Sequence, residues 1–266
     1  LGSSVLSTAV DSQTAPTSGR FEGAFDIVSS DPEMAGAFSM AFSGSFDTPS
    51  QASFMELDFG DLFAAMAEGD SDEAEGMALF GDAMSEPIRV ITIGEEAWMQ
   101  WGFFSLMGVE SDQWVSTDSS ETGSLTEGFG FGGTAGSPAD FLQQFKDANA
   151  DITELGTETV RGVETTHVRA VIDFKELAET LPADDREELL SNLGSAEGFD
   201  TLPIDFWIGE DGYVYRYVVS MDMSNMADSE GLDSVTITYE IYDYGTDVGI
   251  EAPDAALVVD GDTIGF

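Results

Sequence analysis

The chain has no cysteine among its 266 residues, which excludes disulfide bonds, thiolate metal centres and a cysteine nucleophile. Positive charge is scarce too, because 8 lysines and arginines stand against 52 aspartates and glutamates, for a formal net charge of -44. Charge attraction to DNA, RNA or an anionic membrane surface is incompatible with that balance. We therefore predict no nucleic-acid partner.

Signatures of common enzyme classes are missing as well. The chain has no G-x-S-x-G turn, no phosphate-binding glycine loop and no H-E-x-x-H pair. Its one histidine, His167, alternates with the apolar residues Val168 and Ala170 on a predicted strand. We interpret His167 as a surface histidine that points away from the core, rather than as a catalytic base. The sequence indicates no cofactor and no enzyme activity.

The many acidic residues fit two interpretations. A dense carboxylate surface keeps a protein soluble at high salt, or it recruits divalent cations. The segment DSDEAEG, residues 70–76, resembles a calcium loop, but Ala74 stands at a ligand position and no glutamate has the required spacing. We interpret this segment as a solvated loop and predict no metal site. An acidic glycoside hydrolase stays a third functional alternative, because two carboxylates suffice for that chemistry.

Hydrophobic residues are plentiful: they make up 42% of the chain, and 19 of them are phenylalanine. This content is sufficient for a large core. No apolar run is long enough to span a bilayer. Because the chain begins at Leu1 rather than methionine, we expect that an export signal has been removed. We therefore predict an extracytoplasmic location, in the cell envelope or secreted.

Alternation of apolar and polar residues predicts a mostly antiparallel sheet. The predicted strand regions are residues 20–27, 37–46, 52–59, 87–101, 152–173, 202–223 and 234–245. Turns are predicted at Gly94-Glu95 and Arg161-Gly162, and a two-residue hairpin turn at Asp211-Gly212. After that turn, alternation places Tyr213, Tyr215 and Tyr217 on one face.

Helices are predicted between the strands. They are predicted in residues 3–15 and 137–148, on either side of an acidic loop within 60–84, and as two helices separated by Pro182 within 173–194. Residues 116–136 are rich in glycine, serine and threonine, which predicts a long flexible loop. We expect a single α+β domain over residues 1–266, in which a large curved antiparallel sheet wraps around several inserted helices.

The apolar strand faces pose a choice between an ordinary core and the wall of a cavity. Each residue alone is most simply a core residue. Together, a curved sheet with helices laid into it can leave unfilled space, and linings rich in methionine and phenylalanine suit lipid-like ligands. The candidate lining residues are Phe21, Phe25, Phe38, Met40, Phe42, Met55, Leu57, Phe206, Ile208, Tyr215 and Tyr217.

Short motifs follow one another across residues 155–255. They are Gly162-Val163, Ile172-Asp173, the strand Leu202 to Ile208, Asp211-Gly212, Asp243-Tyr244-Gly245 and Pro253. In this order and spacing the chain resembles actinobacterial envelope lipoproteins of the LppX/LprG type. The resemblance implies a half-open antiparallel β-barrel wrapped around helices, similar to LolA-type carriers. It also implies a hydrophobic cavity for the acyl chains of lipids or lipoglycans, and no enzyme activity.

The resemblance sets the leading hypothesis, an extracytoplasmic lipid-binding or lipid-carrier protein. Its partners would be acyl chains and an envelope transporter or acceptor protein, and we expect a monomer. Phe129 and Phe131, in the loop at 116–136, are then candidate lid residues. This family usually begins with a lipidated cysteine, which the present sequence does not contain, and the mode of anchoring is left open. The alternative is a ligand-free sensor or structural envelope domain of the same fold with a filled core.

Overall fold

The computed structural model describes residues 17–30, 36–60, 86–119, 151–173, 201–224 and 231–264. Its strands are β1 (Ser18–Ser29), β2 (Gly36–Asp47), β3 (Ala52–Asp58), β4 (Ile88–Ile93), β5 (Glu96–Gln100), β6 (Trp114–Asp118), β7 (Asp151–Val160), β8 (Val163–Asp173), β9 (Thr201–Gly209), β10 (Val214–Asp222), β11 (Leu232–Tyr242) and β12 (Val258–Asp260). Short helical elements are η1 (Gly102–Met107), η2 (Ala255–Leu257) and α9 (Gly261–Ile264).

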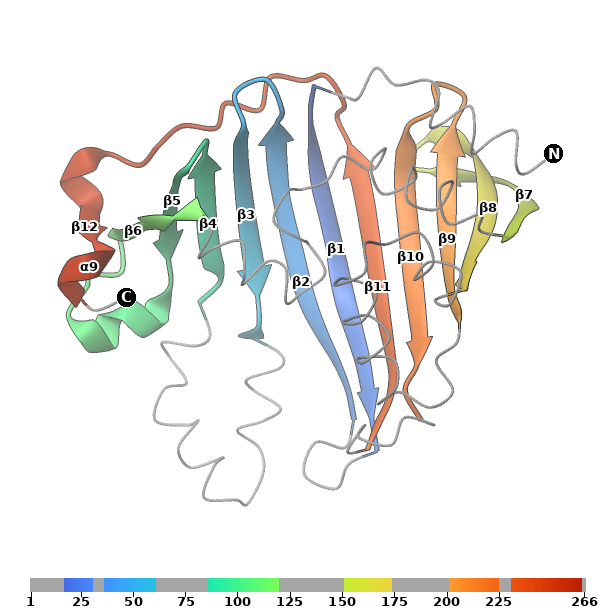
Figure 1. Ribbon diagram of the computed structural model, residues 1–266, viewed down its shortest axis with the longest axis horizontal. Helices are drawn as coiled ribbons and strands as arrows, with labels where there is room; N and C mark the ends of the chain where they lie inside the picture. Colours follow the sequence, from blue (N-terminus) through green and yellow to red (C-terminus); the bar gives the residue numbers. More distant parts are fainter. Residues whose placement is uncertain are drawn as a thin grey trace, which may run out of the picture. The chain divides into compact units, whose positions relative to one another are not determined.

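Hydrogen bonding orders the strands β12-β6-β5-β4-β3-β2-β1-β11-β10-β9-β8-β7 (Figure 1). Strands β2 to β6 pair antiparallel with their neighbours in sequence, and so do β7 to β11. The pairing of β12 with β6 is parallel. The predicted large antiparallel sheet is therefore confirmed, and each predicted strand region contains at least one strand.

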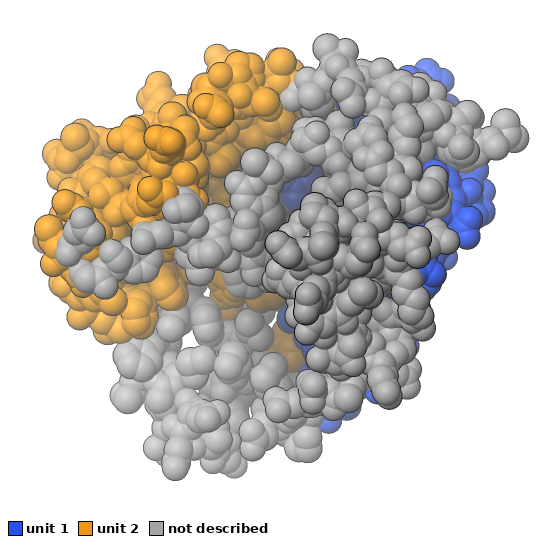
Figure 2. Space-filling view, viewed as in Figure 1, with its two compact units in different colours: residues 1–15, 25–37, 137–241 blue, residues 16–24, 38–136, 242–266 orange. Residues whose placement is uncertain are grey.

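Two compact units divide the chain, and each is described by itself (Figure 2). Unit 1 comprises residues 1–15, 25–37 and 137–241, and unit 2 comprises residues 16–24, 38–136 and 242–266. The prediction of a single domain over residues 1–266 stays a prediction. The helices predicted at 3–15, 60–84, 137–148 and 173–194 lie outside the described residues, apart from Gly60 and Asp173.

The turn at Arg161-Gly162 is confirmed as the two-residue turn of a hairpin. It joins the paired residues Val160 and Val163, and both turn residues have positive φ, 48° and 85°. Positive φ at both positions gives the twist that a two-residue hairpin requires. Gly162 supplies one of these positions without the steric cost that a side chain would add.

The turn at Asp211-Gly212 differs from the predicted two-residue form. Gly209 N–H donates to the carbonyl of Tyr213, and Gly212 N–H donates to the carbonyl of Gly209. Only Gly212 of the Asp211-Gly212 pair has positive φ, 82°. This pattern is a three-residue loop in which a left-handed glycine follows an ordinary turn, so the loop needs one positive φ rather than two.

The start predicted for the flexible loop at 116–136 lies too early in the chain. Residues 116–118 are the end of β6, where they pair with residues 96–98 of β5, and Ser116 also pairs with Asp260 of β12. Pairing with β5, and with β12 at Ser116, supplies backbone hydrogen bonds to this segment. A composition rich in serine and threonine does not reveal that such strand pairing occurs. Residues 120–136, with Phe129 and Phe131, lie outside the described residues.

Unit 2 has an apolar cluster at the β4, β5 and β6 end of its sheet. Phe104 of η1 is 1% exposed there and packs with Val90, Met99, Val109 and Val115. On β2, Phe42 contacts Phe21 of β1 with ring centroids 6.4 Å apart. The alternation of apolar residues in these strands therefore builds buried packing, as the sequence predicts.

Candidate functional site

The apolar face of unit 1 is the face of β8, β9 and β10 that carries its buried cluster. The cluster consists of Val168, Ala170, Ile172, Ile204, Phe206, Ile208, Val214 and Val219. Tyr217 and Met221 are partly buried and pack against it. Cross-strand pairing explains the grouping, because Tyr217 stands opposite Phe206 and Val219 opposite Ile204.

Tyr215 does not share this apolar face, contrary to the alternation predicted after the turn. The pairing of β10 with β9 shifts register between Val214 and Arg216, so Tyr215 occupies a β-bulge. Val214 takes the cluster position opposite Ile208. The Tyr215 ring lies beside Gly209, and its hydroxyl donates to Asp211 at 2.7 Å. Burial and the Asp211 carboxylate raise the pKa of the Tyr215 phenol.

The other candidate lining residues are placed unit by unit. In unit 1, Phe25, Phe206 and Ile208 are buried, and Tyr217 is half-buried. In unit 2, the buried residues are Phe21, Phe38, Met40, Phe42, Met55 and Leu57. Burial fits both a filled core and a cavity wall, so the lining role stays a proposal for these residues.

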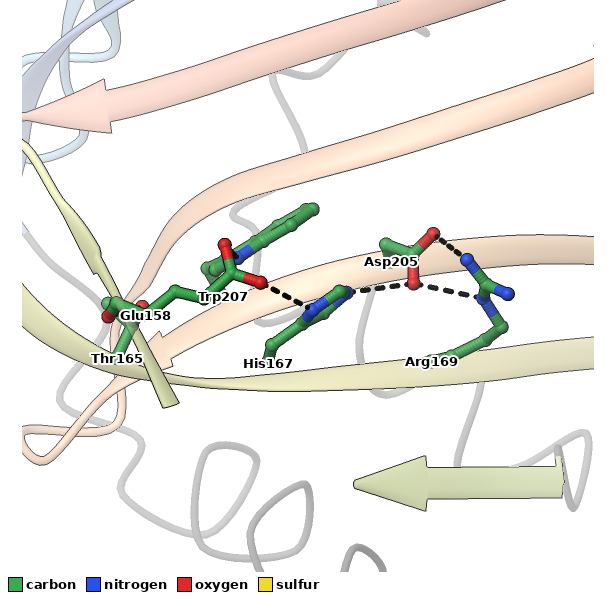
Figure 3. Close-up of polar contacts among 6 residues, drawn as sticks. All are labelled: Glu158, Thr165, His167, Arg169, Asp205 and Trp207. Carbon is green, nitrogen blue, oxygen red and sulfur yellow. Dashed lines mark hydrogen bonds and ion pairs between the residues drawn. The ribbon is translucent and has the colours of Figure 1, made fainter. Parts of the chain in front are cut away.

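The opposite face of the same strands carries a polar network in unit 1, which we call the polar face (Figure 3). His167 on β8 and Arg216 on β10 both stand opposite Trp207 on β9. The imidazole stacks on the indole, with ring centroids 4.2 Å apart and planes 15° apart. The Arg216 guanidinium carbon lies 5.3 Å from the indole centroid. A stack of three side chains therefore crosses three strands, with a cation–π contact at one end.

His167 lies between two carboxylates on this face. Its Nδ1 is 3.1 Å from Glu158 Oε1, and its Nε2 is 2.9 Å from Asp205 Oδ1 (Figure 3). Because ionised carboxylates only accept hydrogen bonds, both contacts are satisfied when both ring nitrogens carry a proton. The prediction that His167 points away from the core is confirmed. It is not a plain surface residue, however, because its side chain is only 14% exposed.

The network continues on both sides of His167. Arg169 binds Asp205 in a bidentate pair at 3.0 and 2.8 Å, and the Trp207 indole N–H donates to Glu158 at 3.0 Å. On β11, Glu240 accepts from Arg216 and from Arg161 of the β7–β8 turn. Three of the chain's 8 basic residues and its only histidine thus gather on one face of one unit.

Hydrogen bonding within the network shifts its carboxylates toward the ionised form. Burial works to raise the pKa of Asp205, but hydrogen bonds from Arg169 and His167 outweigh it and hold that pKa below its usual value. Glu240 follows the same pattern, with Arg216 and Arg161 outweighing burial to lower its pKa. The Trp207 indole N–H lowers the pKa of the exposed Glu158 carboxyl, with His167 adding to the effect.

These lowered pKa values predict a pH-dependent contribution to stability. A carboxyl with a lower pKa in the folded than in the unfolded chain stabilises fully above its unfolded pKa of about 4, and the contribution is lost as pH falls through the folded pKa. We expect Asp205→Asn to lower the free energy of unfolding by about 1–2 kcal/mol at pH 6, because Arg169 and His167 lose a charged acceptor. In urea unfolding this difference should shrink toward zero as the pH falls through the lowered pKa of Asp205.

Asp243→Asn is the matched control for that experiment. Asp243 pairs with Arg20 at 3.4 Å in unit 2, and both side chains are 48% exposed. We expect this exposed pair to contribute less than about 0.5 kcal/mol at either pH. An Asp205→Asn effect of the same size at pH 6 and at low pH would contradict an electrostatic origin.

Within the described ranges, no group of three histidine, aspartate or glutamate side chains is arranged to hold a metal ion. The calcium-like segment at 70–76 lies outside those ranges. The helices among the described residues are too short or too polar to cross a membrane.

No protein-family model matches the chain. An uncharacterised 31.2 kDa protein of Streptomyces griseus is 31% identical over 116 residues, which cover 42% of this chain and 35% of that protein. The match thus spans about a third of the length of this curated relative, and it concerns only part of each protein.

Solved structures extend the comparison to nearly the whole chain. LprF from Mycobacterium bovis superimposes with a TM-score of 0.52 at 13% identity, covering 96% of this chain and 97% of LprF. The chain has the fold of LprF. The Mycobacterium tuberculosis lipoprotein LppX has a TM-score of 0.49 at 12% identity, covering 94% of this chain and 100% of LppX. The similarity to LprF confirms, at the level of the fold, the resemblance seen in the C-terminal motifs.

The sequence did not reveal the polar network. Alternation places His167 and Trp207 off the apolar face, but it does not pair them with each other or with Glu158. These partners are 9 to 49 residues apart in sequence, and only the strand register brings them together. A weak signal was available, namely that a chain so poor in basic residues places Arg161, His167 and Arg169 within nine positions.

Proposed function

We propose that this protein is a non-enzymatic, extracytoplasmic lipid-binding or lipid-carrier protein. The observation that carries the proposal is the apolar face of unit 1, where Phe206 and Ile208 sit within a continuous hydrophobic cluster on a sheet of LppX/LprG-type fold. Acyl chains would leave water for a cavity along this face. Each buried methylene would contribute about 0.8 kcal/mol before the cost of ordering the chain.

The finer architecture belongs to the same proposal. The sheet would curl into a half-open barrel around the predicted helices, as a single domain and a monomer. The lining would include the nine buried candidates, namely Phe21, Phe25, Phe38, Met40, Phe42, Met55, Leu57, Phe206 and Ile208. Tyr217 extends the lining next to Phe206, at a ring-centroid distance of 6.3 Å. Phe129 and Phe131 would act as the lid, and an envelope transporter or acceptor protein would exchange the lipid.

The first test is whether the protein carries lipid. Purified without detergent, it should show bound lipid in native mass spectrometry, and the delipidated protein should bind a fluorescent fatty acid. A protein that is consistently empty and also fails to bind the fatty acid would eliminate the carrier function. That result would favour the alternative of a ligand-free envelope domain with a filled core.

A pair of variants then tests the apolar face itself. Met221→Glu adds a charge at the margin of the cluster, and we expect at least a tenfold loss of fatty-acid affinity, about 1.4 kcal/mol or more, because a buried charge is costly. Ser220→Glu is the matched control, because Ser220 is the exposed neighbour on the same strand. Circular dichroism of both variants checks the fold. Equal affinity in the two variants would place the ligand elsewhere.

A further inference from the structure

The connection between β5 and β6 carries an uncharged apolar segment, WGFFSLMG, residues 101–108. Most of it forms η1, the green coil after β5 in Figure 1. Leu106 is 53% exposed and Met107 is 42% exposed. Single exposed apolar residues are common on protein surfaces and need no explanation, but two adjacent ones in an uncharged segment form a patch. We call the exposed residues Ser105, Leu106 and Met107 the η1 tip.

The rest of the segment is firmly held. Phe104 is 1% exposed in the unit 2 cluster, and Trp101 stacks on Phe103 with ring centroids 4.9 Å apart. Phe104 N–H donates to the Trp101 carbonyl, and Gly108 N–H donates to the Ser105 carbonyl. Gly108 ends η1 in the left-handed conformation, with φ 86°. Because its base is fixed, the tip presents Leu106 and Met107 to water instead of folding them onto the cluster.

We propose that the η1 tip is a contact site for a lipid bilayer, with Leu106 and Met107 entering the boundary between headgroups and acyl chains. Short apolar segments bind membranes in this way, by burying side chains at the interface without spanning it. The η1 tip shares no residue with the proposed lipid lining. It would bring unit 2 to a membrane whether or not the protein carries a ligand.

The net charge of the chain and the small size of the η1 tip identify the kind of partner. The chain has a net charge of -44, and the exposed Glu110 and Asp112 follow the tip closely, so an anionic surface would repel it. Zwitterionic headgroups remove that repulsion. Stable protein interfaces use about 20–30 residues on each side, far more than this tip offers. A fluid bilayer requires no complementary shape, so a small apolar tip suffices for reversible binding.

The absence of cysteine allows a site-specific test with the full chain. Met107→Cys carries a single environment-sensitive fluorophore on the tip. Leu155→Cys carries the same fluorophore on β7, where Leu155 is 47% exposed in unit 1. On mixing with phosphatidylcholine vesicles, we expect a blue shift and an intensity gain at position 107 and none at position 155. Equal signals at the two positions, or no signal at 107, would overturn the proposal.

Vesicle flotation with unlabelled variants gives an independent measurement. Leu106→Ser combined with Met107→Ser should reduce binding to phosphatidylcholine vesicles at least about tenfold, because both inserted side chains become polar. Leu155→Ser should bind as the parent does. High salt should leave binding unchanged or strengthen it, and added phosphatidylglycerol should weaken it. Parent-like binding by the double variant would overturn the proposal. So would a dimer, seen by analytical ultracentrifugation, that the double variant loses.

Fatty-acid binding separates this inference from the proposed function. The Leu106→Ser, Met107→Ser double variant should bind the fluorescent fatty acid as the parent does. If the parent binds vesicles but never a fatty acid, the carrier function fails and the bilayer contact stands. If the parent binds a fatty acid but not vesicles, the bilayer contact fails and the carrier function stands.

Discussion

Phe206→Ala is expected to lower the free energy of unfolding by about 3–5 kcal/mol, the range measured for large-to-small substitutions of buried aromatic residues. Phe206 is 1% exposed and lies within the unit 1 cluster, where its ring faces that of Tyr217. Removing the ring loses its buried apolar area and leaves a cavity. The strands cannot move together to close this cavity, because β9 is hydrogen-bonded to β8 on one side and to β10 on the other. Urea unfolding at neutral pH measures the change.

Phe54→Ala is the matched control for this substitution. Phe54 is also on a strand, β3, but it is only half-buried. We expect a loss roughly half as large, because less apolar area is removed from water. If Phe206→Ala costs no more than Phe54→Ala, the unit 1 cluster is loosely packed. Such packing would favour a cavity that already has room beside Phe206.

Gly44→Ala is expected to destabilise by about 2–3 kcal/mol, because a side chain at this position overpacks the sheet. A Cβ atom on Gly44 would lie 2.2 Å from the backbone carbonyl oxygen of Phe54 and 2.5 Å from Cζ of Phe21. Gly44 stands opposite Met55 in the pairing of β2 with β3, so relief requires these strands to separate. Thermal and urea unfolding should both report the loss.

Two further variants test the cause of that loss. Ser43→Ala, the neighbour on β2, should change stability by less than about 0.5 kcal/mol. Adding Phe21→Leu to Gly44→Ala should not restore stability, because the nearer contact is to backbone, which cannot rotate away. Recovery in the double variant would show that the aromatic ring, rather than the strand spacing, limits this position.

The polar face gives unit 1 a second source of order beside its apolar cluster. Side chains on the polar face link neighbouring strands from β7 to β11 to one another, through ion pairs, hydrogen bonds and the Trp207 stack. Among the described strands, β7 pairs with β8 alone, so the Glu158 contacts to His167 and Trp207 are a second attachment for this strand.

The sequence alone determined the features that depend on local periodicity and composition. Alternation located the strand regions and the apolar residues on β8 and β9, and the hairpin turn predicted at Arg161-Gly162 is the turn between β7 and β8. The charge balance predicts no nucleic-acid partner. The C-terminal motifs pointed to the LppX/LprG-type fold, which the similarity to LprF confirms. These features can be predicted because each depends on residues close together in the chain.

Only the tertiary structure decided the features that depend on strand register. A one-residue bulge moved Tyr215 off the apolar face and put Val214 there, because a shift of one residue exchanges the two faces of a strand. Pairing of residues 116–118 with β5, and of Ser116 with β12, turned this segment from loop into strand. Register also assembled Glu158, His167 and Trp207 from three strands. The exposure of Leu106 and Met107 depends in the same way on Phe104 filling the cluster beneath them, which alternation along the chain does not encode.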